Sequence, residues 1–128
     1  MALVKKFEDL KAWQAARKLV SGVYAATRQE PFARDFGLRD QIQRAAVSTM
    51  SNIAEGFDSG TDGDFSRFLT YTRASAAEVQ SLLYVALDAG YLLQKDFDTL
   101  YRLAEETKAL SGGLLASIRR RSAKSHRR

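Results

Sequence analysis

Residues 38–56 read LRDQIQRAAVSTMSNIAEG and contain the clearest helical pattern in the chain. Apolar or small side chains recur there at steps of three and four, which places them on one face of a helix. Glycine takes the left-handed backbone conformation at low cost, so Gly56 is a natural end for this helix. The pattern predicts a helix over about 38–55 whose inward stripe consists of Leu38, Ile42, Ala45, Ala46, Thr49 and Ile53.

Three further segments show the same spacing, and we predict helices over about 7–29, 64–89 and 95–119. Pro31 disfavours helical geometry at the residue before it and ends the first of these helices. No segment alternates between apolar and polar residues as a strand does. Four amphipathic segments with short connections predict an all-α fold, an antiparallel up-down-up-down four-helix bundle.

Two local features bear on the helix ends. Thr61 followed by Asp64 resembles a capping box at the start of the third helix, although Glu or Gln is the usual partner. Gly112 and Gly113 interrupt the predicted helix over 95–119. Either a partner backbone packs closely against these glycines, or the helix frays early.

The composition excludes several classes of protein. The chain has 128 residues and no cysteine, which excludes disulfides, thiolate metal sites and a cysteine nucleophile. The N-terminal residues show no secretory signal, and no apolar run approaches the length of a membrane span. We therefore expect a soluble cytoplasmic protein without a membrane partner.

The positive charge of the chain is concentrated at its C-terminal end. The formal net charge is +5, but residues 119–128 hold six of the 20 Lys and Arg residues and none of the 15 acids. We predict a bundle domain over residues 1–118 and a basic tail over 119–128 whose first three residues extend the last helix. Any electrostatic affinity for nucleic acid then rests on Arg119, Arg120, Arg121, Lys124, Arg127 and Arg128.

The predicted helix over 64–89 keeps no clean polar face. From Ala74 to Leu93, apolar residues occur around most of its circumference. No helix of a four-helix bundle is surrounded on all sides, so part of this surface should be covered by another copy of the chain. We expect a homo-oligomer whose interface includes Tyr84 and Val85.

A polar stripe runs beside the apolar one on the 38–55 helix. If this helix and the next are antiparallel about a turn near residue 61, the register predicts two ion pairs, Arg44 with Glu78 and Glu55 with Arg67. The stripe could line a binding or catalytic pocket. Ion pairs across a bundle need no ligand, so we favour a structural polar network that fixes the register. This network comprises Arg44, Asn52, Glu55, Arg67, Ser75 and Glu78.

The sequence shows none of the residue combinations that common helical-bundle enzymes and nucleotide-binding proteins use. The single histidine, His126, lies in the tail, which excludes a di-iron bundle site and a Ser-His-Asp arrangement. No glycine-rich loop follows a strand, so the usual nucleotide sites are missing too. We predict a non-enzymatic protein without a cofactor or metal. Four tyrosines, Tyr71, Tyr84, Tyr91 and Tyr101, could stack on bases, but their helical spacing, like that of Trp13, is typical of core aromatics.

Several segments resemble the bacterial four-helix bundle proteins of the 23S rRNA intervening-sequence family. They are FEDLKAW at residues 7–13, FGLRDQ at 36–41, RAAVS at 44–48, SNIAEG at 51–56 and FSRFL at 65–69. The resemblance covers about residues 7–118. The chain departs from the family at Met50, where a proline is common, and at Ala74, where a glycine is common.

The resemblance implies a small cytoplasmic bundle that forms a ring of five subunits. It also implies a link to RNA or DNA, and a nucleic-acid enzyme such as a reverse transcriptase as a possible partner. The main functional hypothesis is therefore a non-catalytic oligomeric scaffold associated with nucleic acid through its basic residues. The alternative is a protein–protein interaction adaptor with no nucleic-acid role.

Overall fold

The computed structural model describes residues 4–126, and over this range it contains four α-helices and two short 3-10 helices, with no strand. The prediction of an all-α fold is confirmed. The α-helices are α1 (Lys11–Thr27), α2 (Phe36–Asp58), α3 (Asp62–Asp88) and α4 (Gln94–His126), and the 3-10 helices are η1 (Phe7–Asp9) and η2 (Phe32–Arg34).

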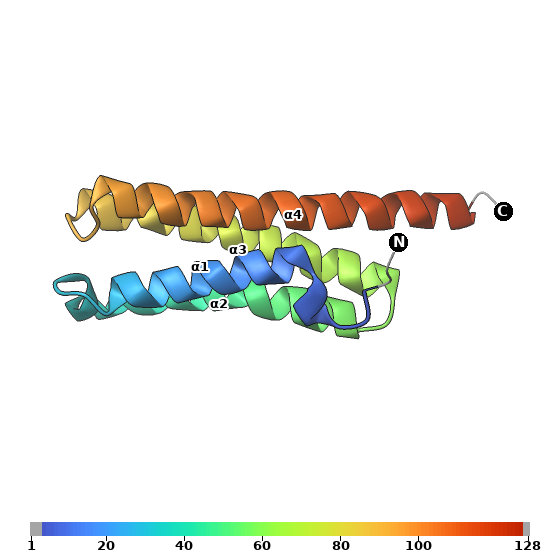
Figure 1. Ribbon diagram of the computed structural model, residues 1–128, viewed down its shortest axis with the longest axis horizontal. Coiled ribbons are helices and arrows are strands. Elements are labelled where there is room, and N and C mark those ends of the chain that lie inside the picture. The colour runs from blue at the N-terminus through green and yellow to red at the C-terminus, as the bar shows by residue number, and fades with distance from the viewer. Residues whose placement is uncertain (1–3, 127–128) are drawn as a thin grey trace.

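The four α-helices lie roughly along one axis, and the chain reverses direction at each connection (Figure 1). Each helix packs mainly against two others, α1 on α2 and α4, and α3 on α2 and α4. This arrangement agrees with the predicted four-helix bundle. Within residues 4–126, no helix combines the length and the apolar character needed to cross a lipid bilayer.

The core consists of two apolar clusters that follow one another along the bundle. One contains Leu19, Ile42 and Leu83, and the other contains Ile53 and Leu69. All six residues of the stripe predicted for the 38–55 helix are buried, which confirms that prediction: Leu38, Ile42, Ala45, Ala46, Thr49 and Ile53.

Gly56 does not end α2, contrary to prediction. The helix continues to Asp58, and Gly60 instead takes the left-handed conformation with φ +84°. Gly56 is buried, and a Cβ added there would lie 2.7 Å from the Cβ of Phe68. The absence of a side chain thus allows α3 to approach α2 closely beside the α2–α3 turn.

The start of α3 agrees with the sequence pattern. Thr61 is the N-cap residue, and its hydroxyl accepts a hydrogen bond of 3.2 Å from the backbone N–H of Asp64. The short α2–α3 turn therefore has the local chemistry expected from its sequence.

At the other end of α3, Gly90 follows the helix with φ +79°, in the left-handed region.

The last helix is longer than predicted. α4 continues through Gly112 and Gly113 and reaches His126, so the helix includes Arg119 to Arg121, as predicted, and extends beyond them. The helix does not fray at the glycines, and no other backbone of the same chain within residues 4–126 packs against them. The Arg73 side chain lies over Gly112, and nothing approaches the Cβ position of Gly113 within 4 Å.

Candidate functional site

The polar stripe of α2 faces polar side chains of α3. The Ser48 and Ser75 hydroxyls are 2.9 Å apart, and the Asn52 side-chain amide donates to both the carbonyl and the hydroxyl of Ser48. Closer to the core, the hydroxyl of the buried Thr72 donates to the Thr49 carbonyl over 3.0 Å. Level residues thus meet in the antiparallel register that the sequence suggested, through hydroxyls and an amide.

The two predicted ion pairs are wrong. Glu78 accepts a 3.4 Å hydrogen bond from the Gln41 side chain, whereas Arg44 has no hydrogen-bond or ion-pair partner among residues 4–126. All three side chains belong to exposed residues, where water competes with an ion pair and little is gained by ordering two long side chains.

The second predicted pair fails because a nearer carboxylate is available. Arg67 binds Asp64, one turn earlier on the same helix, with 3.0 Å between nitrogen and oxygen. The hydrogen bond to Asp64 raises the pKa of Arg67 above its usual value. Glu55 is exposed and has no such partner in the part of the chain that the structure describes.

An open groove of about 400 Å³ lies over this stripe between α2 and α3. Arg44 and Glu78 line it together with small and polar residues. It presents a cation and an anion to solvent, but its serine hydroxyls bond to each other or to Asn52. Among residues 4–126, no three His, Cys, Asp or Glu side chains gather as a metal site would require.

The cations at the end of α4 differ from one another in their partners. Arg121 forms a two-pronged ion pair with Asp62 at the start of α3, with distances of 2.7 and 3.1 Å. This contact raises the pKa of Arg121. Arg119, Arg120 and Lys124 are exposed and have no hydrogen-bond or ion-pair partner among the described residues.

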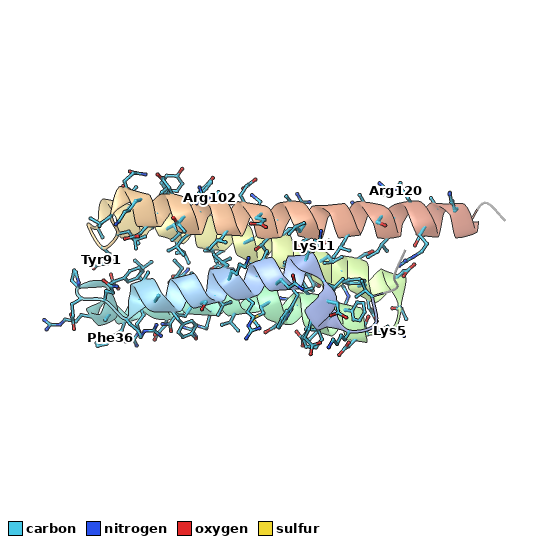
Figure 2. All side chains as sticks on the ribbon, viewed as in Figure 1. Lys5, Lys11, Phe36, Tyr91, Arg102 and Arg120 are labelled. Atoms are coloured by element: carbon cyan, nitrogen blue, oxygen red, sulfur yellow. The ribbon has the colours of Figure 1, made fainter. Side chains whose placement is uncertain are left out.

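The same end of α4 extends past the other three helices (Figure 1). Lys5 lies at this end of the bundle as well, near the level of Arg120 (Figure 2). Arg127 and Arg128, which the sequence also assigned to the basic tail, lie outside the described residues. The structure therefore places three unpaired cations near the end of α4, with Arg119 and Arg120 preceding the Arg121 contact to α3 and Lys124 following it.

The exposed surface of α3 includes both predicted interface residues. Tyr84 and Val85 are each 50% exposed. The Tyr84 ring packs against Phe97 and Tyr101 of α4, with centroids 4.9 and 5.9 Å away. The prediction that the tyrosines are core residues is wrong for Tyr71 and Tyr84, because both keep about half of their surface in solvent.

Sequence reasoning missed a polar bridge between α3 and α4. The buried Gln80 donates to Glu105 over 2.7 Å and accepts from Lys108 over 3.0 Å. The hydrogen bond from Gln80 and the charge of Lys108 lower the pKa of Glu105. A glutamine on the buried stripe of α3, between Val79 and Leu83, was the available signal.

A hydrogen bond that the sequence did not predict links the α1–α2 connection to the α3–α4 connection, at the end of the bundle opposite the α4 C-terminus. Asp35 caps α2 by accepting from the Leu38 N–H, and its second oxygen accepts a 2.9 Å hydrogen bond from the Tyr91 hydroxyl. This hydrogen bond raises the pKa of Tyr91. Asp35 at a helix start was recognisable as a cap, but its distant partner was not.

The fold and its surface define a small antiparallel helical-bundle protein with a projecting basic helix. The chain belongs to the 23S rRNA-intervening sequence protein family, whose pattern matches residues 8–113. The resemblance seen in the sequence is thus confirmed.

A solved structure has the same fold. It is described as a protein with unknown function from the S23 ribosomal protein family of Bacteroides thetaiotaomicron, and it superimposes with a TM-score of 0.74. The alignment covers 81% of this chain and 97% of that chain at 18% identity, so the likeness concerns the fold. No curated protein matches the chain.

Proposed function

We propose that this protein is a non-catalytic, oligomeric scaffold in the cytoplasm that associates with nucleic acid through the basic end of α4. The nucleic acid is RNA or DNA of the ribosomal or retroelement type, and the scaffold has a nucleic-acid enzyme as a further partner. The family's name, which refers to 23S rRNA, supports a link to RNA.

One observation carries the proposal, namely three cations that are exposed and unpaired near the end of α4, the helix that extends past the other three. Arg119, Arg120 and Lys124 are held on a helix, with no carboxylate neutralising them. The Asp62 carboxylate is occupied by Arg121, so it does not neutralise Arg119, Arg120 or Lys124. Phosphate contacts from such cations give affinity without sequence preference.

Oligomerisation would strengthen this weak interaction. Exposed apolar side chains on α3, Tyr84 and Val85 among them, support contact with further copies of the chain, and we propose a pentamer. Copies of the basic helix end held in one assembly raise each other's effective concentration. The assembly then binds a long nucleic acid much more tightly than one subunit does.

The experiment compares two triple variants with equal loss of charge. Arg119→Gln/Arg120→Gln/Lys124→Gln removes the cations of the α4 end. The control Arg28→Gln/Lys95→Gln/Arg102→Gln removes three exposed cations in the opposite half of the bundle. Affinity for a fluorescent RNA and a DNA duplex is measured by anisotropy at several salt concentrations.

We expect the first variant to bind weakly and the control to bind nearly as the wild type. Losing three phosphate contacts should reduce the slope of log affinity against log salt by about 2 to 3 for each subunit that contacts the nucleic acid. Equal losses in both variants would exclude the α4 end as the binding element. Absence of binding by the wild-type protein at low salt would instead favour the protein–protein adaptor.

A further inference from the structure

The outer face of α1 is basic and contains no acid. The helix Lys11–Thr27 carries Lys11, Arg17 and Lys18, all exposed, and has no Asp or Glu at any position. None of the three forms a hydrogen bond or an ion pair through its side chain within residues 4–126. This face therefore presents cations that neither its own helix nor a neighbouring one neutralises.

An open groove of about 550 Å³ runs along this face and exposes part of Trp13. Trp13 is only half-buried, so its interpretation as a core aromatic is incomplete. The Phe7 ring packs edge-on against it, and the Arg17 guanidinium carbon lies 5.7 Å from its ring centroid. The groove is lined by Glu8, Trp13, Gln14, Arg17, Lys18 and Ser21, so it contains one carboxylate beside two cations.

A second aromatic and arginine pair on the surface has a different charge environment. On α3, the Arg67 guanidinium lies 6.0 Å from the ring centroid of the exposed Tyr71. Arg67 is already bound to Asp64, which offsets its charge. Arg17 forms no ion pair with the Glu8 carboxylate that also lines the groove, so its guanidinium can bind an anion beside a planar group on Trp13.

The groove begins in the half of the bundle that contains the basic end of α4. Leu10 and Ala12 at the start of α1 share one apolar cluster with Leu115 and Ile118 of α4. Arg119 follows Ile118 directly in the chain. Lys11, at the start of α1, lies in the half of the bundle from which α4 projects, but short of the level of Arg120 (Figure 2).

We propose that the Trp13 groove is a base-stacking site for single-stranded nucleic acid. One base stacks on the exposed part of the Trp13 ring, and the Arg17 guanidinium moves from the ring to the adjoining phosphate. Lys18 and Lys11 contact neighbouring phosphates, and the strand continues toward Arg119 and Arg120. A base within a duplex is not free to stack in this way, so the site favours unpaired strands.

This inference rests on the proposed function, and Trp13 provides a direct test because it is the only tryptophan in the chain. Tryptophan fluorescence, excited at a wavelength that tyrosine does not absorb, therefore reports on this groove alone, although the chain also has five tyrosines. The full-length protein is titrated with single-stranded RNA, single-stranded DNA and duplex of about twelve nucleotides or base pairs, and anisotropy follows binding in parallel. We expect both single strands to quench Trp13 and the duplex to bind with little quenching.

Substitutions separate stacking from charge. Trp13→Leu keeps an apolar contact for Phe7 but removes the stacking surface, and we expect about tenfold weaker binding of single strands. Trp13→Phe should retain most of the affinity. The matched control is Tyr71→Leu, since its ring also lies beside an arginine, and it should leave binding unchanged. Circular dichroism and thermal unfolding establish that each variant is folded.

A charge variant covers the case in which Trp13→Leu does not fold. Arg17→Gln/Lys18→Gln changes two exposed residues outside the core, and it should weaken single-strand binding while reducing the quenching at saturation.

The outcomes distinguish this inference from the proposed function. If single strands bind with strong salt dependence but leave Trp13 fluorescence and Trp13→Leu affinity unchanged, the stacking site is wrong and the α4 interface stands. Quenching of equal depth by poly-glutamate would show a general polyanion surface and would also overturn stacking. If no nucleic acid binds, both proposals fail together.

Discussion

At the residue scale, two glycines show how the same residue type serves opposite roles in a helix. Gly56 is buried between α2 and α3, where an added Cβ would lie 2.7 Å from Phe68 and 3.0 Å from the Phe65 ring. Gly113 is exposed in α4 with open space at its Cβ position. The first glycine permits close packing, whereas the second only weakens its helix.

Alanine at these two positions should therefore change stability in opposite directions. Gly56→Ala forces a clash that the Phe68 Cβ cannot relieve by rotation, and we expect a loss of about 1–3 kcal/mol. Gly113→Ala should stabilise the protein by about 0.5–1 kcal/mol through helix propensity. Urea unfolding followed by circular dichroism measures both. A neutral Gly56→Ala would contradict the close α2–α3 contact.

Glu105 makes the stability depend on pH. Its hydrogen bond from Gln80 and the Lys108 charge hold the pKa of the carboxyl below its ordinary value, so the ionised form is favoured in the folded state. The resulting stability is present above the ordinary carboxyl pKa and is lost as the pH falls through the lowered one.

We therefore expect the wild type to have a higher Tm than Glu105→Gln at about pH 7, with a difference that shrinks toward about pH 3. Glu106→Gln is the control, because Glu106 is exposed and has no hydrogen-bond or ion-pair partner among the described residues. Thermal unfolding at several pH values tests this. A difference that grows on acidification would contradict the assigned sign.

At the element scale, the Arg121–Asp62 ion pair ties the projecting end of α4 to the start of α3. Its nitrogen and oxygen atoms are 2.7 Å apart, and both side chains are largely exposed. Exposed pairs contribute under about 1 kcal/mol, so the pair should order the helix end more than it stabilises the whole fold.

Asp62→Asn should therefore change the global free energy of unfolding by less than about 1 kcal/mol. It should nevertheless accelerate amide hydrogen exchange in residues 119–126 relative to the rest of α4. Asp64→Asn provides the control, since it removes the same charge from the same helical turn but pairs within α3. Equal exchange at the α4 end in both variants would mean that the ion pair does not hold it.

At the scale of the whole molecule, the apolar surface of α3 predicts self-association. Tyr84 and Val85 are half-exposed, and the Tyr84 ring extends an aromatic cluster with Phe97 and Tyr101 onto the surface. A monomeric bundle would leave this surface in water, whereas a further copy of the chain would cover it.

Light scattering at micromolar concentration should give a mass several times the 14.3 kDa of one chain. Val85→Glu should shift the mass toward the monomer, because a carboxylate would be buried in the interface. Ala25→Glu, on the exposed part of α1, should not. A wild-type mass of one chain would exclude the oligomer and the avidity argument with it.

The sequence by itself determined the helices and their inward faces. The stripe from Leu38 to Ile53, the Thr61 cap and the alternation of four amphipathic segments depend on spacing along one helix, which local chemistry decides. The family could be recognised for the same reason, since motifs such as SNIAEG at residues 51–56 are contiguous. The approximate register of α2 against α3 followed from one short turn.

Only the tertiary structure decided which polar groups meet. Arg67 binds Asp64 rather than Glu55, and Arg121 reaches Asp62 across 59 residues of sequence. Gly56 could be read as a helix end until Phe68 was seen against it, and Trp13 as a core residue until its groove was seen. Such choices depend on distances between helices and on competition with water, which helical periodicity does not contain.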